Sequence, residues 1–128
     1  MNVFFLFNDG QLVTPPLGGT ILPGITRASI IELARDIGLT VDEQPYAFET
    51  WRDDAASGRL REVFACGTAA VVAAIGEVRH AGGTFRVADG GEGATTRRLR
   101  DRLVGLQRGG EPDDRGWLHR IAPAAAAR

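Results

Sequence analysis

Residues 3–13, VFFLFNDGQLV, contain two short apolar runs separated by three residues that favour tight turns. Asn8, Asp9 and Gly10 tolerate the positive φ angles that a hairpin needs. The pattern therefore predicts a β-hairpin with strands over 3–7 and 11–13. The first run holds five apolar residues. That is too short for a membrane span or a secretory core, and no basic flank precedes it.

Outward from the hairpin, helix and strand signals follow in a mixed order. Residues 27–37 carry apolar side chains at helical spacing and stop at Gly38, which predicts a helix with a glycine C-terminus. A last helix is expected over 94–106. The other expected elements are a helix over 49–57 before Gly58 and strands over 39–41, 62–66, 70–78 and 84–87. The order predicts an α/β (α+β) fold, a mixed sheet or pseudo-barrel with flanking helices.

Length and composition set modest limits on the class of protein. A chain of 128 residues with 44% apolar and 24% charged residues indicates one globular domain. We expect this domain over 1–121, followed by a disordered alanine-rich tail over 122–128. A net charge of −1 gives no general attraction to nucleic acid or to membranes. The single cysteine cannot form an internal disulfide, which favours a cytoplasmic location.

The segment 21–27, ILPGITR, places a Pro-Gly turn directly before a helix. The first amides of a helix lack internal partners and carry partial positive charge, so they suit a phosphate. Gly24 allows the backbone to approach a ligand closely. An ordinary helix start remains the alternative, since every helix has such amides. Ser29-x-x-Glu32 also matches a capping box, which would begin the helix three residues later and weaken the phosphate geometry.

The segment 64–70, FACGTAA, has a strand that enters a run of small residues. Small side chains leave the amides of Thr68 and Ala69 accessible, and the Thr68 hydroxyl can donate to an anion. An ordinary strand-loop-strand crossing is the alternative. Neither segment resembles a P-loop or a complete dinucleotide-binding fingerprint.

Taken together, these segments are similar to the class IV pyridoxal-phosphate enzymes, and most closely to the branched-chain amino acid aminotransferases. The resemblance runs from Met1 to about Ile121. It implies that the chain corresponds to the C-terminal domain, less than half of such an enzyme. The supporting stretches are 1–5 (MNVFF), 12–17 (LVTPPL), 21–27, 61–64 (REVF) into 67–69, and 116–118 (GWL).

The resemblance also implies roles for individual residues. The amides of Ile25 and Thr26, beside Gly24, would bind the phosphate of pyridoxal 5′-phosphate, and the Thr68 hydroxyl would donate to the same phosphate. Leu22 would pack against the pyridine ring. The amides of Thr68 and Ala69 would hold the substrate carboxylate. D-amino acid aminotransferases and aminodeoxychorismate lyases, which usually differ at positions 67–70, are the alternatives within the family.

The chain contains no lysine, since all 15 basic residues are arginines. The Schiff-base lysine of the family lies upstream of the stretch that resembles this chain, so no catalytic residue is assigned here. We therefore expect the chain to be inactive by itself and to bind pyridoxal 5′-phosphate weakly or not at all when alone. The resemblance implies an N-terminal aminotransferase domain, homo-oligomer partners, and small amino acid and 2-oxo acid substrates. The alternative is a non-catalytic truncated or split-gene product that acts as an assembly partner.

Other polar residues are expected to be structural. Cys66 is predicted to be a buried apolar residue, and the two histidines lack the spacing of metal ligands, so no metal site is expected. The pair Asp53-Asp54 is predicted to be solvated. The basic residues of the last helix predict a solvated face, with nucleic-acid binding as the alternative. These residues are Arg97, Arg98, Arg100 and Arg102.

Overall fold

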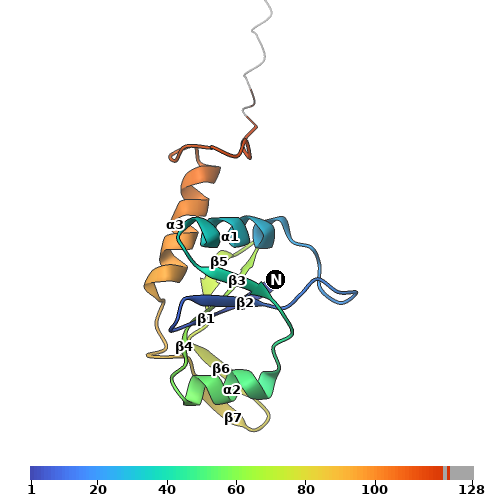
Figure 1. Cartoon of the computed structure of the whole chain (residues 1–128), viewed down its shortest axis with the longest axis vertical. Helices are drawn as coiled ribbons and strands as arrows, with labels where there is room; N and C mark the ends of the chain where they lie inside the picture. The colour runs from blue at the N-terminus through green and yellow to red at the C-terminus, as the bar shows by residue number, and fades with distance from the viewer. Residues whose placement is uncertain (120, 122–128) are drawn as a thin grey trace, which may run out of the picture.

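The computed structural model describes residues 1–119 and 121 (Figure 1). Five strands form one mixed sheet in the order β3-β2-β1-β4-β5. Central β1 (Asn2–Phe7) is antiparallel to β2 (Gln11–Thr14) and to β4 (Leu60–Gly67). The outer strand β5 (Val71–Ala74) is antiparallel to β4, whereas β3 (Thr40–Glu43) runs parallel to β2. The predicted mixed sheet and its first hairpin are confirmed.

The helices lie on the two faces of the sheet (Figure 1). The helices α1 (Ile25–Asp36) and α3 (Ala94–Gln107) pack on one face. On the other face lie α2 (Phe48–Ala56) and the hairpin of β6 (Glu77–His80) and β7 (Gly83–Arg86). The predicted helical flanks are thus confirmed. The predicted tail over 122–128 lies outside the described residues.

Strand β1 has apolar side chains on both faces because both faces are covered. Side chains alternate along a strand, so Phe4 faces the α1 and α3 layer while Phe5 faces α2. Phe4 stacks on its cross-strand partner Phe64, with ring centroids 5.1 Å apart and planes 10° apart. This burial on both sides explains why residues 3–7 of β1 are all apolar.

The start of α1 differs from the capping-box alternative. The helix begins at Ile25, and the Ser29 hydroxyl donates to the Ile25 carbonyl at 3.1 Å inside the helix. Ser29 therefore cannot be the N-cap, and that alternative is wrong. The Pro-Gly turn at Gly24 begins the helix, two residues before the predicted start. Gly38 ends it with φ of 88°, as expected.

Two further predictions from the sequence need correction. The apolar run 70–78 forms parts of two strands in different sheets, β5 and β6, because the chain leaves the main sheet at Ile75-Gly76. Asp54 is buried, not solvated. It accepts a hydrogen bond from the Tyr46 hydroxyl at 2.7 Å and pairs with Arg59 at 2.9 Å. Asp53, by contrast, is exposed.

A carboxylate from the sheet occupies the start of α3. Glu62 of β4 is 5% exposed and accepts hydrogen bonds from the amides of Thr95 and Thr96 at 3.0 and 2.7 Å. It also accepts from the Thr96 hydroxyl at 2.7 Å. A Cβ on Gly93 would lie 2.0 Å from the Glu62 carboxyl carbon, so only glycine fits there. The N-terminus of α3 is thereby fixed to the sheet and closed to other anions.

Candidate anion-binding site

The start of α1 is open. The N-cap residue Gly24 supplies no side chain, no described side chain caps the helix, and its first turn holds no acidic residue. The Gly24 amide donates to the Leu22 carbonyl at 2.8 Å, and the first helical hydrogen bond runs from the Ala28 amide to the Gly24 carbonyl at 3.1 Å. The amides of Ile25 and Thr26 therefore precede this first bond. They retain the partial positive charge of a helix start, which stabilises a nearby anion by about 0.3–1 kcal/mol.

Gly24 has a packing role that the sequence did not reveal. A Cβ at this position would lie 2.7 Å from Oδ1 of Asn2. Nδ2 of Asn2 donates to the Leu22 carbonyl at 3.3 Å. The first residue of β1 therefore braces the turn that leads into α1, and glycine permits this close approach.

The second motif forms the turn between β4 and β5. Gly67 lies opposite Val71, so Thr68, Ala69 and Ala70 make the turn, and both Thr68 and Ala69 are exposed. Val71 has φ of 55°, a left-handed conformation that β-branched residues rarely adopt. The turn is therefore held in an unusual backbone shape, with two candidate ligand residues at its exposed side.

The start of β1 joins the two motifs. Asn2 lies opposite Cys66 in the sheet while its side chain contacts the Leu22 carbonyl. Met1 packs beside Gly67, where an added Cβ would approach the Met1 side chain to 3.2 Å. The structure thus brings the starts of α1 and of the β4–β5 turn to the same end of β1, although Ile25 and Thr68 are far apart in the chain.

Two apolar side chains at the open helix start face solvent. Leu22 is 84% exposed and Ile25 is 85% exposed. An apolar surface of this kind can pack against a ring or against another protein surface. The expected contact of Leu22 with a cofactor ring is therefore sterically available.

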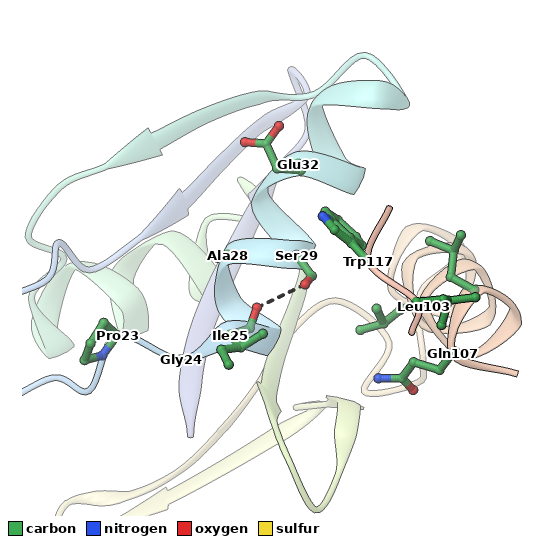
Figure 2. A pocket seen from close by; sticks show the side chains of 11 residues that line it. Pro23, Gly24, Ile25, Ala28, Ser29, Glu32, Leu103, Gln107 and Trp117 are labelled. Atoms are coloured by element: carbon green, nitrogen blue, oxygen red, sulfur yellow. Dashed lines mark hydrogen bonds between the residues drawn. The ribbon is translucent and has the colours of Figure 1, made fainter. Parts of the chain in front are cut away.

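A cavity of about 530 Å³ lies in the groove between α1 and α3 (Figure 2). Ser29 of α1 and Leu103 of α3 face this groove, and Trp117 lies over it. Residues 67–70 do not line it, so it is separate from the β4–β5 turn. The sequence had not indicated this groove, but two of the stretches that it singled out line it. Pro23, Gly24 and Ile25 come from the segment 21–27, and Trp117 and Leu118 come from 116–118.

The titratable groups near the site do not form an acid–base pair. Burial raises the pKa of the Cys66 thiol to about 11, while the positive charges of Arg27 and the amino terminus oppose this rise. Cys66 is fully buried, which confirms its predicted apolar role. Among residues 1–119 and 121, no group of three or more His, Cys, Asp or Glu side chains could hold a metal ion. Over the same residues, no helix is long and apolar enough to cross a membrane.

The arginines of α3 are largely paired. Glu92 binds both Arg97 and Arg100, and Arg102 lies 3.6 Å from Asp36 at the end of α1. These contacts neutralise much of the positive charge on the helix, which weakens the argument for a nucleic-acid interface there.

Comparison with known proteins gives a consistent result. Residues 1–78 match the family model described as amino-transferase class IV. The branched-chain-amino-acid aminotransferases of Mycobacterium tuberculosis and Mycolicibacterium smegmatis are each 48% identical over 124 residues, covering 94% of this chain and 34% of those proteins. A crystal structure of the Escherichia coli branched-chain amino acid aminotransferase superposes with a TM-score of 0.72 at 37% identity. It covers 93% of this chain and 36% of that one.

The chain thus spans about a third of the length of the relatives that it matches. Both the sequence match and the superposition extend over nearly all of the chain, so they include the α1 start and the β4–β5 turn. On this evidence the chain belongs to the class IV aminotransferase family.

Proposed function

We propose that this chain forms part of the active site of a branched-chain amino acid aminotransferase. Its contribution would be the anion-binding wall, which consists of the start of α1 at Ile25 and Thr26 and the turn at Thr68 and Ala69. Such an enzyme would exchange an amino group between leucine, isoleucine or valine and 2-oxoglutarate. The observation that carries the proposal is the uncapped start of α1, at the same end of β1 as the exposed turn 68–70. The branched-chain relatives support this substrate class over that of the other class IV enzymes.

The residues present fit the phosphate end of pyridoxal 5′-phosphate, the cofactor that the family implies. The amides of Ile25 and Thr26 would donate to the phosphate, and the Thr68 hydroxyl would donate a further hydrogen bond to it. Charge-assisted hydrogen bonds of this kind are stronger than neutral ones. Leu22 would cover the ring and exclude water from one face of it.

The substrate carboxylate would lie on the β4–β5 turn. The amides of Thr68 and Ala69 would orient it, and the small side chains of the turn leave room for this approach. When bound, the cofactor supplies an electron sink for the negative charge that develops at the substrate α-carbon. The resemblance to the family implies that one lysine serves as the covalent anchor and transfers the protons, and the chain has no lysine. We infer that another segment, corresponding to the N-terminal domain of the family, supplies this amine.

The proposal is tested by anion binding to the 128-residue chain. We expect pyridoxal phosphate, followed by ³¹P NMR and by amide shifts, to perturb Ile25, Thr26 and Thr68. Thr68→Val removes only the hydroxyl and should weaken binding about tenfold. The matched control Thr84→Val alters an exposed threonine of β7 and should leave affinity unchanged. Amide shifts confined to other regions would refute the assignment.

Activity tests the inferred role of the missing amine. We expect the purified chain with leucine, 2-oxoglutarate and pyridoxal phosphate to show no transamination above the reaction without protein. Adding a separately expressed N-terminal portion of a relative, with its lysine intact, should restore turnover. Turnover by the chain in isolation at the rate of a full-length enzyme would contradict the proposal.

A second candidate function is that of a non-catalytic assembly partner. The exposed Leu22 and Ile25 and the apolar groove under Trp117 favour it, because such surfaces commonly mark protein contacts. This role predicts self-association or capture of an aminotransferase domain in sizing chromatography with light scattering. A sharp monomer peak at high concentration, with no shift on adding that domain, would count against it.

A further inference from the structure

Arg27 is a buried arginine in the first turn of α1. It is 4% exposed, although it follows the open helix start by only two residues. Its Nη2 donates to the Pro15 carbonyl at 3.0 Å and to the Glu43 carboxylate at 2.6 Å. Pro15 follows β2 and Glu43 ends β3, so a single guanidinium ties the helix start to two strands.

The charge of Arg27 is only partly neutralised. Its partner Glu43 has a side chain that is 41% exposed, so water screens the carboxylate more than the guanidinium. Nε of Arg27 is buried and has no hydrogen-bond partner among the described residues. The positive charge also acts on Cys66, the residue before Gly67 and Thr68. Arg27 thus acts on the strand that leads into the β4–β5 turn as well as lying in the first turn of α1.

A purely structural role would not require a guanidinium. An apolar side chain of similar volume avoids the desolvation of a buried charge, and such replacements are often neutral or stabilising. Arginine instead supplies a permanent charge and several donors in a fixed planar arrangement. Both properties are useful beneath an anion-binding turn and neither is needed merely to fill space.

We propose that Arg27 is a positioning residue for the anion-binding wall, which fixes the first turn of α1 and adds positive potential beneath the bound phosphate. This inference rests on the proposed function, because it assumes that the amides of Ile25 and Thr26 receive an anion. It assigns Arg27 no contact with the substrate.

The test compares three variants of the full 128-residue chain with inorganic phosphate as the probe. Arg27→Met removes the charge and both hydrogen bonds, and should weaken phosphate binding at least about tenfold. Arg27→Lys keeps the charge but loses the planar arrangement of donors. Its phosphate affinity should be partly restored, to within about threefold of that of the unaltered chain. The control Arg115→Met breaks an ion pair with Asp36 at the other end of α1 and should leave phosphate affinity unchanged.

Two readouts separate positioning from general stability. Phosphate affinity is measured from the amide shifts of Ile25 and Thr26, and hydrogen exchange of the Ala28 amide reports the first helical bond to Gly24. We expect faster Ala28 exchange in Arg27→Met, and partial rescue of both affinity and exchange in Arg27→Lys. Arg115→Met should lower thermal stability without changing either readout.

Each outcome supports or refutes the positioning role of Arg27. If the unaltered chain and Arg27→Met bind phosphate equally, the role of Arg27 is refuted while the proposed function stands. If phosphate does not perturb the amides of Ile25 and Thr26 in the unaltered chain, both are refuted. Should Arg27→Met fail to fold, Arg27→Lys decides. Full phosphate affinity in Arg27→Lys would refute the positioning role of the planar guanidinium. Reduced affinity in a folded Arg27→Lys chain would support that role.

Discussion

The starts of α1 and α3 lie on the same face of one sheet, yet they differ in what occupies their amides. At α3, the buried Glu62 accepts hydrogen bonds from Thr95 and Thr96. At α1, no described side chain caps the helix and the neighbouring Leu22 and Ile25 are exposed. A helix start filled by the protein's own carboxylate serves stability, whereas one left open retains its capacity for an external anion. The difference separates a structural helix start from a candidate binding site within one chain.

Removing the carboxylate that caps the start of α3 should have the largest effect on the free energy of unfolding. Glu62→Ala leaves the amides of Thr95 and Thr96 and the buried Thr96 hydroxyl without their acceptor. We expect a loss of about 3 kcal/mol in the free energy of unfolding, measured by urea denaturation. The control Glu49→Ala, in the exposed first turn of α2, should cost about 0.5 kcal/mol or less. Equal losses in both variants would contradict the assigned role of Glu62.

A methyl group at the open start should have the next largest effect. Gly24→Ala places a Cβ 2.7 Å from Oδ1 of Asn2, and should destabilise the chain by about 1–2 kcal/mol. Asn2→Ala removes the clashing atom, so the double variant should recover most of that loss. A double-mutant cycle by urea denaturation measures this coupling. Additive losses would show that Asn2 does not impose glycine at this position.

A negatively charged side chain at the start of α1 should stabilise the folded chain and weaken phosphate binding. Ile25→Glu puts a carboxylate on an exposed position in the first turn of α1 and should stabilise the chain by about 0.5 kcal/mol. The same charge should repel phosphate and weaken its binding about tenfold. Ile25→Gln has similar size without charge and should change neither quantity. An unaltered phosphate affinity in Ile25→Glu would argue against an anion at this helix.

Near neutral pH the smallest effect concerns the thiol behind the open start. Burial raises the pKa of the Cys66 thiol to about 11, above its usual value of 9.0. Between these two values the unfolded chain loses the thiol proton while the folded chain keeps it, so stability should fall as pH rises through this window. Cys66→Ala should lack this contribution in urea titrations across the range. In the native chain at pH 8, the thiol should resist alkylation, and rapid labelling would contradict its burial.

Local turn chemistry made much of the fold predictable. Asn8-Asp9-Gly10 and Gly38 mark chain reversals whose backbone angles only a few residues tolerate, and the structure has turns at both places. The run 70–78 was harder, because a continuous apolar stretch has no period that distinguishes one strand from two. The break at Gly76 depends on a distant segment, since a Cβ there would lie 1.9 Å from the Gly90 carbonyl oxygen.

The candidate site was predictable only in part. The segments 21–27 and 64–70 predicted the helix start and the turn, and the resemblance to the family supplied their roles. Glu62 and Arg27 were missed because their partners are remote, 34 residues away at Thr96 and 16 at Glu43. Asp54 was misjudged for a similar reason, since Tyr46 and Arg59 bury it only in the folded chain. Pairings of this kind leave no periodic signal in a sequence.

The contact between Met1 and Gly67 has a practical consequence for anyone who produces this protein. Met1 packs beside Gly67, directly before the turn that begins at Thr68. Any polypeptide joined before Met1, an affinity tag included, would therefore emerge next to that turn and crowd the approach of ligands. Tags for binding experiments on the 128-residue chain therefore belong at the carboxyl end.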